Sequence, residues 1–155
     1  MKAPAHSLFA CFFCILLWSI APPNAVTSKP FILLSGAIAF ILGTLPDLDT
    51  RVPLRVIGHR SGFSHSFFTI VIVSLLAYLI FSSSPPLERI IVPATAGAVA
   101  SHILLDTLTV SGCPLLWPFT RRRYSAHVCA YDNTLVNFAV SALSALGIAA
   151  YIVYT

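Results

Sequence analysis

Charged residues are scarce in this sequence, and their scarcity excludes a soluble globular domain. Asp, Glu, Lys and Arg make up only 9% of the 155 residues, whereas 57% are hydrophobic. In a soluble domain about a quarter of the residues are charged. We therefore expect an integral membrane protein, and the length suits a single domain over residues 1–155.

Acidic residues are the rarer charged class, so the net charge is +4. With a cytoplasmic N-terminus, seven of the nine basic residues fall on the cytoplasmic side, as the positive-inside rule requires. We attribute the basic excess to this topology and to anionic lipids, and we expect no nucleic-acid partner. The topology places inside Lys2, Arg51, Arg55, Arg60 and Arg121 to Arg123, and outside Lys29 and Arg89.

Cysteine is scarce as well, with four residues in the chain, and Cys113 and Cys129 form no pair with zinc-knuckle spacing. Cys11 and Cys14 lie three residues apart in an apolar run, which predicts small core residues on one helix face. Cys113 and Cys129 lie in the longest basic loop and stay reduced if that loop is cytoplasmic. We therefore expect neither a disulfide nor a cysteine-ligated zinc ion.

What the sequence does contain is five apolar segments separated by proline-rich or serine-rich breaks. The last three reach the roughly 20 residues that span a bilayer, whereas the first two are shorter. We predict an all-α, polytopic membrane helical bundle with four or five transmembrane or half-spanning helices. The first segment also has the length of a signal-peptide core, but it lacks a good cleavage site, so we expect it to be retained. The segments are Leu8–Ala21, Phe31–Leu45, Phe63–Phe81, Ile90–Val110 and Leu135–Tyr154.

Six of the ten acids and histidines belong to three short clusters, Asp47 with Asp49, the stretch Gly58–Ser66, and His102 with Asp106. The predicted topology brings all three to the cytoplasmic face. Ionisable groups in apolar spans are costly and usually mark a functional site. Because seven groups exceed the four ligands of one tetrahedral zinc ion, we predict one or two divalent ions, Zn or Mn. The predicted ligands are His6, Asp47, Asp49, His59, His65, His102 and Asp106.

Each motif taken alone has a simpler interpretation. His102 and Asp106, at i and i+4, can tie helices together through a hydrogen bond. The paired acids can form a solvated turn, a lone histidine can be a satisfied loop residue, and Arg60 can be either a clamp for an oxyanion or a positive-inside anchor.

Four further polar residues receive lesser roles. Ser64 and Ser66 do not fit the Gly-x-Ser-x-Gly motif of a serine hydrolase, and we expect them to hydrogen-bond the histidines. His127 and Asp132 lie in a basic loop without matching spacing, so we leave both out of the site.

An aromatic stretch, Trp117-Pro118-Phe119, precedes the three arginines Arg121 to Arg123. The combination is typical of an interfacial aromatic and basic belt. The alternative is a gate for the substrate.

Together these residues resemble the YdjM-like family, the LexA-regulated, membrane-bound metal-dependent hydrolases of the bacterial inner membrane. The motifs cover about two-thirds of the chain, and their joint occurrence is more specific than any one alone. Relatives tend to carry a glutamate where this chain has Val136, so Asp132 would have to replace it or the site has one group fewer. The resemblance is carried by His6, Leu45–Asp49, Gly58–Ser66, Ser101–Thr109 and Ser111–Phe119.

The resemblance implies a single integral-membrane, metal-dependent hydrolase-like domain over residues 1–155. It implies a phosphoester substrate too, since the family is distantly similar to the zinc-dependent phospholipase C and single-strand nuclease group. We assign catalysis to Asp49, His65 and Arg60, with an unligated aspartate as general base and the arginine steadying the substrate anion. The lipid bilayer and a phospholipid or other phosphorylated substrate are the expected partners.

Two alternatives remain open at the level of the sequence. In the first, the polar cluster of a non-catalytic membrane protein joins helices or binds a regulatory ion. In the second, the chain is a transporter with an intramembrane ion site. The transporter is the weaker alternative, because the second and last segments offer only Ser, Thr and Gly at depth.

Overall fold

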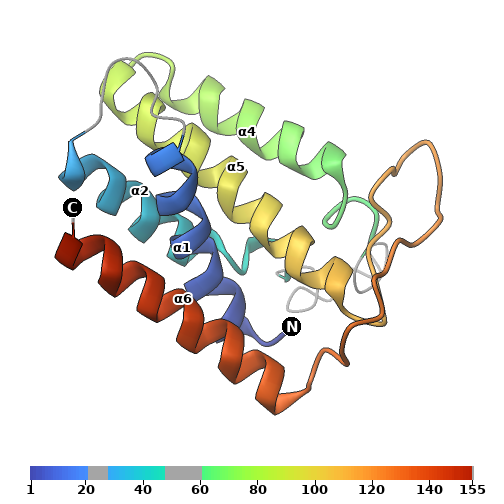
Figure 1. The fold of residues 1–155 in the computed structure, drawn as a ribbon. Helices are drawn as coiled ribbons and strands as arrows, with labels where there is room; N and C mark the ends of the chain where they lie inside the picture. Colours follow the sequence, from blue (N-terminus) through green and yellow to red (C-terminus); the bar gives the residue numbers. More distant parts are fainter. Residues whose placement is uncertain (21–27, 48–60, 155) are drawn as a thin grey trace.

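A computed structural model describes residues 1–20, 28–47 and 61–154, and its regular elements are helices apart from two isolated β-bridges (Figure 1). These residues form five α-helices and one short 3-10 helix, which confirms the predicted fold class. In chain order the elements are α1 (Ala3–Ile20), α2 (Lys29–Leu42), η1 (Leu45–Asp47), α4 (Phe67–Phe81), α5 (Pro85–Leu108) and α6 (Thr134–Tyr154).

Serine and proline define the helix starts. Ser28 precedes α2 and Ser84 precedes α5, and both helices carry proline in the first turn. Proline suits that turn because its missing N–H would have no partner in the helix. Ser66 precedes α4, and its backbone N–H donates to Thr69 Oγ1 at 3.3 Å, as in a capping box.

The long helix α5 is the centre of the bundle. It packs against α1, α2 and α4, while α6 packs against α1 (Figure 1). In the most apolar stretch of α5, 61% of the residues are buried inside the protein, compared with 11% in α6. A helix at the centre can carry buried ionisable groups near its end, and α5 carries His102 and Asp106 there.

Four helices are long and apolar enough to cross a membrane: α1, α2 continued through η1, α5 and α6. Their outward side chains are large and apolar. On α6, for example, Phe138 is 71% exposed and Leu143 is 68% exposed. Such a surface is costly in water and suits the lipid of a bilayer.

The predicted lengths of three segments were wrong. Helix α1 has 18 residues and α2 with η1 has 19, so the first two segments are long enough to span. Helix α4 begins at Phe67, not Phe63, and has only 15 residues. Hydropathy misplaced these ends because polar residues such as His6 are helical, whereas apolar Phe63 lies in the turn before α4.

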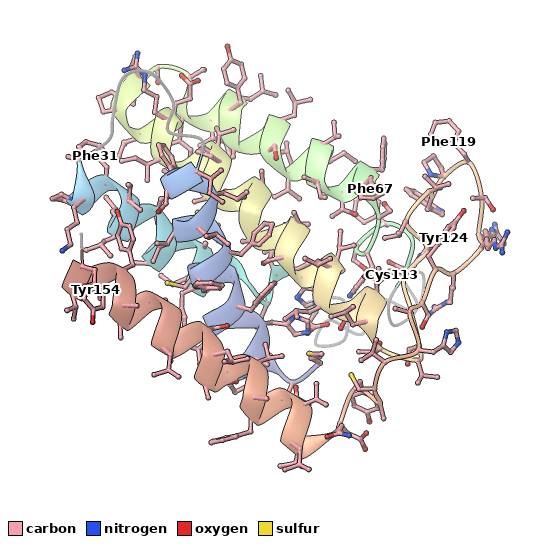
Figure 2. The ribbon with its side chains drawn as sticks, viewed as in Figure 1. Phe31, Phe67, Cys113, Phe119, Tyr124 and Tyr154 are labelled. Carbon is pink, nitrogen blue, oxygen red and sulfur yellow. The ribbon has the colours of Figure 1, made fainter. Side chains whose placement is uncertain are left out.

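Residues 109–133 connect α5 to α6 and contain two isolated β-bridges, Thr109 with Cys129 and Cys113 with Tyr124. Gly112 has a positive φ of 58°, and a side chain there would meet the backbone of Tyr124. We call residues 113–124 the 113–124 hairpin. It projects beyond the end of α5, with Phe119 near its tip (Figure 2).

Cys11 and Cys14 carry free thiols. Cys14 is buried in the apolar core, where its Sγ lies 3.2 Å from Ser35 Oγ on α2, and Cys11 packs against the same core. Both residues are therefore core residues, as their spacing predicted.

Candidate metal centre

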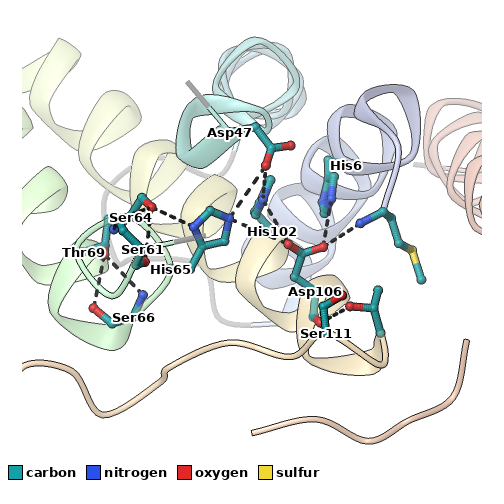
Figure 3. A network of polar contacts seen from close by, with 12 residues as sticks. His6, Asp47, Ser61, Ser64, His65, Ser66, Thr69, His102, Asp106 and Ser111 are labelled. Carbon is teal, nitrogen blue, oxygen red and sulfur yellow. Dashed lines mark hydrogen bonds and ion pairs between the residues drawn. The ribbon is translucent and has the colours of Figure 1, made fainter. Parts of the chain in front are cut away.

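Four segments converge at one end of the bundle and place acids and imidazoles side by side (Figure 3). They are the first turns of α1, the 3-10 helix after α2, the turn before α4 and the last turns of α5. The helices alternate in direction, so segments that are distant in sequence end at the same level. The convergence that the predicted topology required is present among the described residues.

Helix α5 contributes His102 and Asp106, one turn apart and both fully buried. The Nδ1 of His102 donates to the carbonyl oxygen of Gly43 at 2.8 Å. That bond fixes the tautomer, so Nε2 carries the lone pair and faces the carboxylates. Nε2 lies 3.8 Å from Asp106 Oδ2 and has no hydrogen-bond partner among the described residues.

Gly43 can approach α5 because it has no side chain. A Cβ there would lie 2.9 Å from Ala10 Cβ and 3.0 Å from the His6 carbonyl oxygen, both on α1. The glycine thus lets the end of α2 pass close to α1. Its carbonyl is then within reach of His102.

The turn before α4 contributes His65, which is fully buried. Its Nδ1 lies 2.8 Å from Ser64 Oγ, and the Ser64 hydroxyl in turn donates to the Ser61 carbonyl at 3.3 Å. In the tautomer with the proton on Nδ1, the serine oxygen accepts that proton. The Nε2 of His65 then faces Asp47 Oδ1 and Asp106 Oδ2, both at 3.7 Å.

Asp47 closes the cluster from the 3-10 helix. Its Oδ1 lies 3.5 Å from His102 Nε2. Its side chain is 26% exposed, whereas the side chains of His65, His102 and Asp106 are not exposed at all. Asp47 is therefore the solvent-accessible side of the cluster.

Asp47, His65, His102 and Asp106 each offer one ligand atom, and the four atoms lie within 4.8 Å of one another. Two ligands of a tetrahedral zinc ion, each 2.0–2.2 Å from the metal, lie about 3.3–3.6 Å apart. The observed separations between imidazole nitrogen and carboxylate oxygen are 3.5–3.8 Å. Small side-chain shifts would therefore bring these atoms to the spacing of zinc ligands. Two imidazole lone pairs facing two carboxylates repel one another unless a metal ion or a proton lies between them. The donor set therefore fits a divalent metal ion.

His6 lies beside this group of four. Its ring stacks on that of His102, with centroids 3.7 Å apart and planes 14° apart. Its Nε2 is 3.3 Å from Asp106 Oδ1, which also contacts the Met1 amino group at 2.6 Å. His6 is thus close enough to join the cluster or to hold Asp106 in place.

The comparison with protein families assigns the chain to a family. The model of the YdjM inner membrane protein family matches residues 1–155. The chain belongs to the YdjM inner membrane protein family. Together with the four apolar helices, this assignment places the chain in the inner membrane as a multi-pass protein. Comparison with curated proteins and with solved structures finds no match.

In this YdjM family member the structure brings together five of the seven predicted ligands, counting His6 beside the group of four. The remaining two predicted ligands, Asp49 and His59, and the predicted catalytic Arg60 lie outside the described residues. His127 and Asp132 are exposed and lie outside the cluster, as expected. Val136 packs against the apolar group of Met1, Ala5, Leu105 and Cys129.

Two supporting groups were not recognised in the sequence. The first is the Gly43 carbonyl, a backbone group whose contact with His102 cannot be recognised from residue types. Asn137 stands next to Val136, is buried, and its Oδ1 accepts the Lys2 backbone N–H at 2.8 Å, which fixes the chain just before α1. An amide side chain in an apolar helix was the available signal for Asn137.

The two serines near His65 have different roles. The prediction for Ser64 is confirmed by its hydrogen bond to His65. Ser66, in contrast, contacts Thr69 at the start of α4, so a bond to a histidine was the wrong role for it.

This difference provides a matched pair of substitutions. Ser64→Ala should weaken zinc binding by about 10–100-fold, because the loss of a partner that orients a ligating histidine typically has that effect. Ser66→Ala should leave zinc affinity within about twofold and lower stability by about 1 kcal/mol, the usual cost of a lost helix cap. Competition titration against a zinc indicator, with thermal unfolding of both variants, measures the two effects. Equal zinc affinity in wild type and Ser64→Ala would exclude this role for Ser64.

Proposed function

We propose that this chain is a membrane-bound, metal-dependent hydrolase that forms one domain and cleaves a phosphoester at the cytoplasmic face. The observation that carries the proposal is the buried group of Asp47, His65, His102 and Asp106 at one end of the bundle. Mixed sets of imidazole and carboxylate suit zinc and manganese. Membership of the family supports an inner-membrane site of action.

Asp47, His65, His102 and Asp106 would hold the ion, and His6 is the neighbour that can add a ligand or hold Asp106. A bound Zn or Mn ion supplies positive charge that activates water at neutral pH and neutralises a phosphoester oxygen. The Gly43 carbonyl and the Ser64 hydroxyl orient the two imidazoles, so that neither ring has to reorganise during the reaction.

The substrate would approach from the side of Asp47, the only partly exposed member of the group of four. Asp49 follows Asp47 by two residues, within about 7 Å along an extended chain. Because the four described groups complete a tetrahedral site, we assign Asp49 as the unligated general base that accepts a proton from water, and not as a metal ligand. We assign Arg60 as the clamp that binds the substrate anion through two parallel hydrogen bonds. Both roles follow from the sequence.

The charge distribution supports a cytoplasmic position for this end of the bundle. Of the basic residues that the structure describes, Lys2 and Arg121 to Arg123 lie toward the metal-centre end, and Lys29 and Arg89 start the helices at the opposite end. Lys29 donates to the Ile152 carbonyl, near the end of α6, at 2.6 Å. The four-to-two ratio has the direction of the positive-inside rule.

One observation favours a second candidate, a non-catalytic protein with a structural or regulatory ion. Three of the four groups have fully buried side chains, and structural metal sites are closed whereas catalytic sites keep an open position. In that case the metal would stabilise the bundle without any turnover.

A single substitution separates the two candidates. Asp49→Asn should leave the metal content of the purified protein unchanged and lower the hydrolysis rate about 10²–10⁴-fold, the usual contribution of a general base. The measurement uses proteoliposomes loaded with zinc or manganese, with bis(p-nitrophenyl) phosphate and radiolabelled phospholipid as substrates. Asp132→Asn is the control, because Asp132 is exposed and outside the cluster. Stoichiometric metal with no hydrolysis by the wild type would favour the structural ion.

A further inference from the structure

The 113–124 hairpin combines exposed apolar and basic side chains. Phe119 is 93% exposed and Leu116 is 45% exposed. Arg121, Arg122 and Arg123 follow directly and are all exposed. Residues 109–133 contain these three arginines and one acid, Asp132, so the segment is strongly basic. Neither the fold nor the metal centre explains an exposed phenylalanine beside three arginines.

The first half of the hairpin packs on the turn that carries His65. The Leu115 carbonyl accepts the Phe67 backbone N–H at 3.0 Å. The Trp117 ring makes edge contacts with Phe63 and Phe68, with centroids 6.1 Å and 5.7 Å apart. Trp117 also fills the space beside Gly62, where no Cβ would fit.

The second half is held to the end of α5, just after Asp106. Arg123 Nη1 donates to the Ser111 carbonyl at 3.3 Å. Cys113 and Tyr124 exchange backbone hydrogen bonds of 3.0 Å and 2.9 Å. The Arg122 guanidinium lies over the Tyr124 ring, 5.8 Å from its centroid. The hairpin is therefore fixed relative to the helix ends, and the exposed side chains near its tip keep a defined position.

The position of the hairpin indicates which kind of partner it can bind. It projects from one end of the bundle (Figure 2). Because four helices of that bundle are long and apolar enough to cross a membrane, we expect the tip of the hairpin near the lipid headgroups. An exposed aromatic side chain at that level packs among headgroups and upper acyl chains. Adjacent arginines attract anionic lipids, with about a fivefold gain per basic residue near the surface. Guanidinium groups also match the geometry of a phosphate.

We propose that the 113–124 hairpin is a binding surface for the headgroup of an anionic phospholipid. Arg121, Arg122 and Arg123 bind the phosphate and its negative charge, and Phe119 inserts beside the acyl chains. This binding is independent of the proposed hydrolase activity.

The test compares two short-chain lipids with identical acyl chains, dihexanoyl phosphatidylglycerol and dihexanoyl phosphatidylcholine. Their binding to the detergent-purified full-length protein is titrated by native mass spectrometry. The wild type should prefer phosphatidylglycerol by more than tenfold. Each Arg→Gln change at 121, 122 or 123 should lower that preference about fivefold, and the triple Gln variant should show almost none. The triple Lys variant should retain most of it, because the charge remains.

Two further variants make the assignment specific. Arg89→Gln removes one exposed arginine at the opposite end of the bundle and should leave the preference within about twofold. Phe119→Ser should weaken both lipids equally and leave their ratio unchanged. An equal affinity of the wild type for the two lipids, or a preference that survives in the triple Gln variant, overturns the proposal. Metal content is measured on the same samples, so a failed metal centre is recognised separately from a failed lipid surface.

Discussion

Asp106→Asn is expected to remove the bound metal from the purified protein. The carboxylate of Asp106 is fully buried and lies within 4 Å of His6, His65 and His102, so it is the group shared by every histidine in the cluster. Asparagine keeps the shape but removes the charge and one strong oxygen ligand. Since loss of a supporting residue alone weakens metal sites by about 10–100-fold, loss of this ligand should exceed about 100-fold. Elemental analysis after purification at fixed zinc concentration measures the change.

The matched control for this substitution is Asp132→Asn, which removes one exposed carboxylate outside the cluster. Its metal content should equal that of the wild type. His102→Ala should behave like Asp106→Asn, because it removes a second member of the same group. If Asp106→Asn retains a full equivalent of zinc, the carboxylate is not a ligand and the proposed centre is wrong.

Removal of the metal is expected to lower the unfolding temperature of the wild type by about 10 °C. Without the metal ion, two carboxylates and two imidazoles crowd one buried space, which is costly even though the Met1 amino group contacts Asp106 from outside the group of four. An ion that binds only the folded protein stabilises it by about 4 kcal/mol at a thousandfold excess over its Kd. For a chain of this length that energy corresponds to roughly 8–16 °C. Thermal unfolding in detergent, with and without a chelator, provides the measurement.

His102→Ala is the control for the chelation experiment. It should unfold at a lower temperature than the wild type, and its unfolding temperature should not respond to the chelator. If the chelator shifts His102→Ala as much as the wild type, the stabilising ion binds elsewhere. An unchanged wild type would show that no metal stabilises the fold.

The fold class could be predicted because composition and helix-breaking residues can be read directly from the amino-acid sequence. Proline and serine define the starts of α2 and α5, and apolar content requires a bilayer. The helix ends could not be predicted from hydropathy. Polar His6 is helical because it points into the buried cluster, and apolar Phe63 is not helical because its ring packs against Trp117 in the turn. In both cases a tertiary contact decided the local structure.

The site was predictable to the extent that chemistry is carried by side chains. The i, i+4 pair of His102 and Asp106, and Asp47 after a helix-ending proline, are patterns that the sequence displays. The Gly43 carbonyl was not predictable, because a backbone group leaves no mark in the sequence and reaches His102 only through close packing of α1 and α2. Which of the two serines hydrogen-bonds His65 also depended on where α4 begins. Ser66 directly precedes that helix and caps its first turn through Thr69, so Ser64 is the serine that contacts His65.

Anomalous X-ray diffraction from crystals of the zinc-loaded protein is the most direct test of the central claim. The claim predicts one strong anomalous peak about 2.0–2.2 Å from a carboxylate oxygen of Asp47, from Nε2 of His65 and His102, and from a carboxylate oxygen of Asp106. A peak elsewhere in the molecule, or no peak with these four side chains turned away from one another, would contradict it.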